Sequence, residues 1–135
     1  SRLVVQAPRR KRTTPAMAEL AALELFTRCR DHLIAQAAIS MGPDAVTGKP
    51  SLRYRGTHGR RCPIGALIPD SAYDEGFEGI PVGRLPEEVL EAAGIVRELL
   101  PLARELQLVH DRYPMTEWRR RLDEIGERFG PQEVA

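Results

Sequence analysis

The segment from Arg53 to Gly65 carries the side chains of this chain that are best suited to bind an anion. It reads Arg-Tyr-Arg-Gly-Thr-His-Gly-Arg-Arg-Cys-Pro-Ile-Gly, and no acidic residue lies between Lys49 and Arg61. Arginine suits phosphate and carboxylate groups because its planar guanidinium donates two parallel hydrogen bonds. Tyrosine or histidine beside it could stack on a base. The candidate binding residues here are Arg53, Tyr54, Arg55, His58, Arg60 and Arg61.

A second basic cluster lies near the start of the sequence. Residues 1–15 contain five basic side chains and no acid, and four of them are Arg9, Arg10, Lys11 and Arg12. Mutual repulsion of these charges predicts that residues 1–14 form a flexible tail. Lysine and arginine clusters of this kind contact phosphates, so the two clusters together predict a nucleic-acid or nucleoprotein partner.

Two observations limit the nucleic-acid prediction. The chain beyond the tail is mildly acidic, and it shows no helix-turn-helix, zinc-finger or RNA-binding fingerprint. The arginines could instead form ion pairs inside the protein. The candidate partners are Asp70, Asp74, Glu75, Glu78 and Asp111.

Cysteine and histidine raise the question of nucleophilic catalysis. Cys62 follows two arginines, which would lower the pKa of an exposed thiol. His58 or His110 could act as its base, and Asp111 could orient a histidine. However, Cys-Pro-Ile-Gly matches no nucleophile signature, and the apolar residues that follow indicate a packed cysteine. The spacing of His110 with Leu106 and Val109 indicates a half-buried packing residue, so we assign no catalytic residue.

The same residue types could bind a metal ion. Cys29 and His32 are one helical turn apart, but a structural zinc site needs four nitrogen or sulfur ligands. Cys29 also lies on the apolar stripe of its predicted helix, where a free cysteine packs as a small hydrophobic residue. The sequence therefore predicts no metal site and no cofactor.

The elements that must position these residues are mainly helical. Thr14 and Pro15 predict an N-cap and a first helical residue, and helical spacing of apolar residues continues to about Ser40. Further helices are predicted after Pro86 and around Pro101. A last helix carries an apolar stripe, which consists of Trp118, Leu122, Ile125 and Phe129.

One small β-hairpin is predicted at about residues 52–63. Its strands would be Arg53–Arg55 and Arg60–Cys62, joined by the Gly-Thr-His-Gly turn. Residues 42–52 are rich in glycine and proline and are predicted to be a loop. The predicted fold is thus mainly α, with about four amphipathic helices and one embedded hairpin in a single domain over residues 15–130. Residues 131–135 form a short tail.

The composition is typical of a soluble globular domain. The 135 residues are 42% hydrophobic and 29% charged, with a net charge of +1. No apolar run approaches the roughly 20 residues that a membrane-spanning helix needs. Two cysteines are too few for a disulfide scaffold and fit a reducing compartment, which predicts a cytoplasmic location.

One motif of the chain resembles a known family. The residues that carry the resemblance are Tyr54-Arg55-Gly56, Gly59, Cys62 to Asp70, Tyr73 and Glu78-Gly79, followed by Leu106, His110-Asp111, Pro114 and Trp118. This pattern, over roughly residues 24–129, is similar to a family of small phage and prophage proteins. Members often have further cysteines where this chain has Leu52 and Ala66, so a shared metal or redox site is not implied. The family has no established activity.

The resemblance implies a phage-type source, and small phage proteins commonly dock on other proteins. The function that we expect is that of an accessory or regulatory binding protein without catalysis. Its partner would be nucleic acid or a nucleoprotein complex, contacted by the arginine-rich hairpin and the basic tail. The alternative partner is a host or virion protein, with no membrane involved. The expected location is the host cytoplasm or the virion.

Overall fold

Helix α1 (Pro15–Gln36) begins where the sequence predicts. In the computed structural model, which describes residues 14–129, Oγ1 of Thr14 accepts a hydrogen bond from the amide of Met17 at 3.1 Å. Pro15 occupies the first turn, where its missing N–H leaves no bond unmade. The helix ends at Gln36, before the predicted end near Ser40. It ends there because Ala37 adopts a left-handed conformation with φ of 46°.

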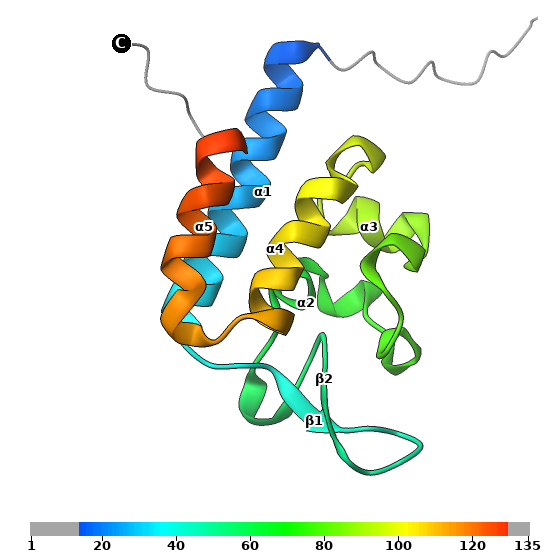
Figure 1. Cartoon of the computed structure of the whole chain (residues 1–135). Helices are drawn as coiled ribbons and strands as arrows, with labels where there is room; N and C mark the ends of the chain where they lie inside the picture. Colours follow the sequence, from blue (N-terminus) through cyan, green and yellow to red (C-terminus); the bar gives the residue numbers. More distant parts are fainter. Residues whose placement is uncertain (1–13, 130–135) are drawn as a thin grey trace, which may run out of the picture.

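Two further long helices pack beside α1 and contribute to the core. Figure 1 shows α5 (Met115–Phe129) running beside α1, and α4 (Leu100–Arg112) beside α5. At the crossing of α1 and α5, a Cβ atom on Gly126 would lie 2.8 Å from Cζ of Phe26, so the glycine makes room for the ring. Three residues of the predicted apolar stripe, Trp118, Leu122 and Ile125, are buried in one hydrophobic core, which also contains Phe26, Cys29 and Leu33 of α1, and Phe129 packs at its edge.

Two short helices complete the domain. Helix α2 (Pro63–Leu67) packs against α1, and helix α3 (Glu87–Ala92) follows Pro86 as predicted. Several single-turn 3₁₀ helices connect the longer elements. The chain is therefore mostly helical with a small antiparallel sheet, which confirms the predicted fold class. In residues 14–129 no helix is both long enough and apolar enough to cross a membrane.

The position of the β-hairpin was predicted wrongly. The strands are β1 (Met41–Pro43) and β2 (Pro50–Leu52), with Gly42 opposite Ser51, and they lie in the segment that the sequence assigned to a loop. A turn closes this pair, because Oδ1 of Asp44 accepts hydrogen bonds from the amides of Val46 and Thr47 at 2.8 and 2.9 Å. Such a side-chain turn joins strands without the glycine pair on which the prediction relied.

Residues 53–62 fold back on themselves with only a single β-bridge, between Arg55 and Arg61, around the 3₁₀ turn η1 (Thr57–Gly59). The amides of Tyr54 and Arg55 donate to the carboxylate of Glu78 instead of to a strand partner. This competition for the backbone donors explains why no regular ladder forms here.

Candidate binding surfaces

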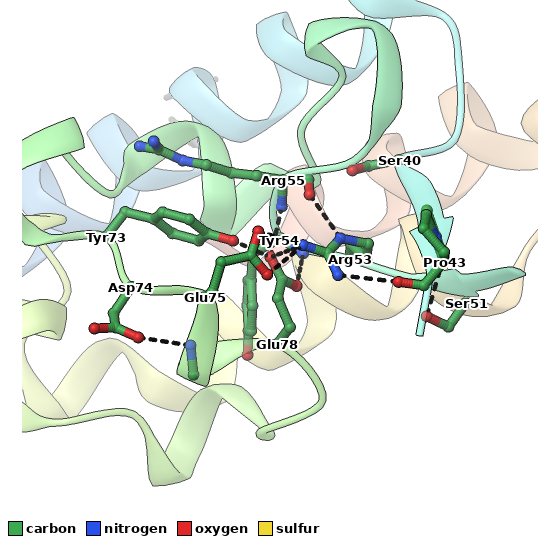
Figure 2. Close-up of polar contacts among 12 residues, drawn as sticks. Ser40, Pro43, Ser51, Arg53, Tyr54, Arg55, Tyr73, Asp74, Glu75 and Glu78 are labelled. Carbon is green, nitrogen blue, oxygen red and sulfur yellow. Dashed lines mark hydrogen bonds and ion pairs between the residues drawn. The ribbon is translucent and has the colours of Figure 1, made fainter. Parts of the chain in front are cut away.

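The Arg53 side chain is held inside the protein by carboxylates. Its Nη2 lies 2.8 Å from both Oε1 and Oε2 of Glu75 and 3.8 Å from Oε2 of Glu78, as Figure 2 shows. Its Nε and Nη1 donate to the carbonyls of Arg55 and Pro43 at 2.9 and 3.3 Å. The hydrogen bond to Glu75 raises the pKa of Arg53. With 11% of the side chain exposed, Arg53 has little surface left for an external phosphate.

Glu78 is the centre of this network. Its carboxylate accepts hydrogen bonds from the amide of Tyr54 at 2.7 Å, from the amide of Arg55 at 3.2 Å and from the hydroxyl of Tyr73 at 2.5 Å. The carboxylate is 10% exposed, so its charge is satisfied almost entirely by protein donors. Figure 2 shows Glu78 lying beside Tyr54 at the point where these contacts converge.

Tyr54 is a packing residue rather than a stacking platform. It is buried, and its hydroxyl donates to the carbonyl of Ile80. Burial raises the pKa of Tyr54. The ring therefore cannot stack on a nucleotide base without opening the fold.

Arg55 and Arg61 share one acidic partner. Nη2 of Arg55 lies 2.8 Å from Oδ1 of Asp70, and Nη2 of Arg61 lies 3.3 Å from the same atom. The Arg55 guanidinium also stacks over the Tyr73 ring at 4.2 Å and donates to the carbonyl of Ile68. Ion pairing of the arginines with the acidic segment, which the sequence left as an alternative, is thus present for Arg53, Arg55 and Arg61.

The tip of the loop is the part of this segment that faces solvent. His58 and Arg60 are both exposed, and within residues 14–129 the guanidinium of Arg60 makes no ion pair. His58 has a φ of 59°, a left-handed backbone conformation that is uncommon for residues other than glycine. Of the six loop residues predicted to contact an anion, these two are exposed, and Arg61 keeps 36% of its side chain exposed.

The arginine-rich loop and the start of α1 lie far apart. The predicted basic residues 9–12 lie outside the described part of the chain, which begins at Thr14. The loop is fixed at the other end of α1, where Gln36 and His32 hydrogen-bond the backbone of Arg61 at 2.7 to 2.8 Å. A helix of 22 residues is about 33 Å long. Figure 1 shows the start of α1 and the segment that follows β2 at opposite ends of the molecule.

Two of the residues considered for nucleophilic catalysis, Cys62 and His110, are buried. Cys62 is 0% exposed, and its sulfur caps α2 by accepting from the amide of Gly65 at 3.3 Å. Burial raises the pKa of the Cys62 thiol to about 12, so it is protonated at neutral pH. His110 is also buried: the Ser40 amide donates to its Nε2, and its Nδ1–H donates to Asp111. These residues act as internal polar contacts, and His58 lies apart at the loop tip.

No group of three or more histidine, cysteine, aspartate or glutamate side chains within residues 14–129 could hold a metal ion. Cys29 is buried on the apolar face of α1, and burial raises the pKa of its thiol to about 12. His32, its neighbour one turn away, contacts the Arg61 carbonyl instead.

Sequence reasoning missed the partners that hold the loop. Gln36 bonds both the amide and the carbonyl of Arg61, and Gln107 accepts from the amide of Ile64. A signal for Gln36 was available, because Gln36 and His32 are spaced i, i+4 and so lie on one side of α1. No comparable spacing in the sequence indicates the contacts that Ser40 makes.

A groove of about 1240 Å³ lies between the first half of α1 and the segment that contains α3 and the start of α4. Its apolar lining includes Ala18, Ala21, Leu85, Leu90, Ile95, Val96, Leu99 and Leu100. The charged residues of its lining are three glutamates, Glu87, Glu91 and Glu98, and one arginine, Arg97. Val96 is 44% exposed, so part of the apolar lining faces solvent. No pattern in the sequence indicates this groove.

The sequence matches no protein-family model, and comparison with curated proteins and with solved structures gives no significant match. The resemblance to small phage proteins therefore stays a prediction.

Proposed function

We propose that this protein is a non-catalytic accessory protein that binds another protein through the groove between α1 and α3. The occupant is a peptide segment that carries aliphatic side chains next to basic ones. The observation that supports this proposal is the composition of the groove, which combines an apolar lining with charged side chains that are mostly acidic.

The apolar part of the groove provides the attraction. Burying exposed aliphatic surface gains roughly 25 cal/mol per Å² of apolar area. Val96, which lines the groove, keeps 44% of its surface exposed. An apolar groove that is partly exposed to solvent is typical of a protein-binding site.

The charges select the type of segment. Glu91 and Glu98 are exposed at the groove, and among the described residues that line it Arg97 is the one with a positive charge. Complementary charge around an apolar contact favours the correct partner and speeds its encounter. A segment with lysine or arginine beside leucine or valine matches this surface, whereas an acidic segment or a phosphate backbone does not.

The contacts of the arginine-rich loop favour a protein partner over nucleic acid. Arg55 and Arg61 are paired with Asp70, which is itself 78% exposed, so this pairing restrains them only weakly. Arg53 is 11% exposed and contacts both Glu75 and Glu78, so phosphate would have to displace a carboxylate from a largely buried guanidinium. Removing a partner from a largely buried charge costs more than an exposed contact returns. The expected phage-type source is compatible with this role, because small phage proteins commonly dock on host or virion proteins.

A labelled model peptide tests the proposal. The probe is a fluorescein-labelled 14-residue peptide of leucine and lysine, and its matched control has glutamate in place of lysine. In fluorescence anisotropy the full chain should bind the lysine peptide at least about tenfold more tightly than the glutamate peptide, because the groove is acidic.

Two arginine substitutions locate the binding. Val96→Arg, in the groove, should reduce the affinity for the lysine peptide by about tenfold, because the substitution adds a positive charge and covers apolar surface. Val46→Arg is the control, since Val46 is 93% exposed in the β1–β2 turn, outside the groove. Equal effects of the two substitutions, or no preference for lysine, would overturn the proposal.

Nucleic-acid binding remains the second candidate, and the exposure of Arg60 and His58 favours it. Filter binding to DNA and RNA across a salt series tests it. If the loop tip contacts phosphate, Arg60→Ala should weaken binding and reduce its salt dependence, because one fewer counterion is released. Binding that is unchanged by Arg60→Ala would contradict a role for the tip.

A further inference from the structure

We propose that the groove is regulated by the protein's own N-terminal segment, residues 3–12, which occupies it and competes with the external partner. This inference rests on the proposed function, because it concerns the same groove. It differs from the proposed function in that the occupant is a segment of this chain and not of another protein.

The chemistry of this segment matches the groove. Leu3, Val4 and Val5 are consecutive aliphatic residues, and residues 9–12 are all basic. The groove offers aliphatic side chains and three glutamates. The segment contains no acidic residue, so the glutamates meet no like charge. It is the type of peptide that the groove should select, aliphatic at one end and basic at the other.

The connection to α1 places the segment within reach. The described chain starts at Thr14, and Ala18, which lines the groove, lies one helical turn further along α1. Residues 5 and 14 are nine positions apart, so an extended chain spans up to about 30 Å between them. The segment can therefore reach the groove, whose lining begins at Ala18 beside its point of attachment.

Covalent attachment favours the internal segment further. A tethered segment has an effective concentration in the millimolar range for a short flexible linker. Even a weak contact is then populated, while a partner present at micromolar concentration must compete for the groove. Binding of the partner therefore requires release of the segment, and the apparent affinity falls with the fraction of open molecules.

The first test is disulfide trapping in the full chain. Val4→Cys is combined either with Val96→Cys in the groove or with Leu20→Cys on α1, and an intramolecular disulfide is followed by peptide mapping under mild oxidation. The native Cys29 and Cys62 do not interfere, because both are 0% exposed. Leu20 is a demanding control: it is 67% exposed, does not line the groove and lies close to Thr14.

A segment that moves freely reacts faster with the nearer, more exposed Leu20→Cys. A segment that occupies the groove reacts faster with Val96→Cys, by about tenfold, and this preference falls when salt screens the glutamates. Trapping at position 96 that is equal to or slower than trapping at position 20 overturns the inference.

The second test measures competition with the leucine–lysine peptide. The variant Leu3→Asp, Val4→Asp, Val5→Asp should bind the peptide about tenfold more tightly than the unmodified chain, since the groove is released. Unchanged affinity overturns the inference and leaves the proposed function intact. Failure of this variant to bind the peptide at all overturns the proposed function, and the regulatory role with it.

Discussion

Ser40 and His110 are 70 positions apart in the chain, and one buried hydrogen bond of 2.8 Å joins the Ser40 amide to Nε2 of His110. Because Nε2 accepts this bond, the ring carries its proton on Nδ1 and donates it to Oδ1 of Asp111 at 2.7 Å. The bond attaches the segment that leads into β1 to helix α4. His110 therefore acts as a buried connector between distant segments.

Replacing His110 should destabilise the protein. His110→Phe keeps an aromatic ring but removes the acceptor, which leaves the buried Ser40 amide without a partner at a cost of about 1–3 kcal/mol. Thermal unfolding followed by circular dichroism measures the loss. Leu108→Ala is the control on the same helix, because Leu108 is 44% exposed and should change stability far less. Equal stability of the two variants would contradict the connector role.

Glu78 and Glu75 offer a matched pair in one loop. Glu78→Gln replaces one carboxylate oxygen with an NH₂ group that faces backbone donors, so we expect a loss of about 1.5–3 kcal/mol from charge-assisted hydrogen bonds. Glu75 is 72% exposed although it bonds Arg53, and Glu75→Gln should cost below about 1 kcal/mol. Urea unfolding of both variants measures the difference. Glu75→Gln being the more damaging change would refute Glu78 as the centre of the network.

The sequence predicted features that depend on neighbouring residues. Thr14 and Pro15 mark the start of α1 because a cap involves residues three positions apart, and the stripe of α5 follows from helical periodicity. The ion pairs between the arginines and the acidic segment were an open alternative for the same reason: two short blocks of opposite charge lie close together in the chain.

Features that depend on distant contacts could not be predicted. In the predicted strand Arg53–Arg55, backbone amides donate to the carboxylate of Glu78, more than 20 positions away, instead of to a neighbouring strand. No local pattern in the sequence shows which carboxylate will accept these hydrogen bonds. Strands β1 and β2 have three residues each, too few for alternation to be visible. The groove could not be foreseen, because its walls come from segments about 60 to 80 residues apart.

Two glycines of the motif have different roles, which substitution by alanine should separate. A Cβ atom on Gly65 would lie 1.9 Å from the carbonyl oxygen of Tyr54, a backbone atom that cannot easily move. Gly65→Ala should therefore cost several kcal/mol or prevent folding, as overpacking and strain add. Gly59 has a φ of 70° but open space around it, so Gly59→Ala should cost only about 1–2 kcal/mol. Similar melting temperatures for the two variants would exclude a tight contact at Gly65.

The buried thiols predict a loss of stability in alkaline solution. Burial raises the pKa of Cys29 and Cys62 to about 12, from an ordinary value of 9.0. As the pH rises above 9, thiols of the unfolded chain lose their protons before those of the folded chain. The unfolded state then binds fewer protons, so the free energy of unfolding decreases between about pH 9 and 12. Below pH 9 both states keep these protons and the thiols add no pH dependence.

Cys29→Ala tests this prediction, because it removes one of the two thiols while Tyr54 and Tyr73, which also have raised pKa values, stay in place. Urea unfolding at a series of alkaline pH values should give a shallower decline for Cys29→Ala than for the unmodified chain. The native protein should also react slowly with a thiol reagent at about pH 8 and rapidly once unfolded, since only the thiolate is nucleophilic. Fast labelling of the native chain, or an unchanged pH slope in the variant, would show that these thiols are neither buried nor shifted.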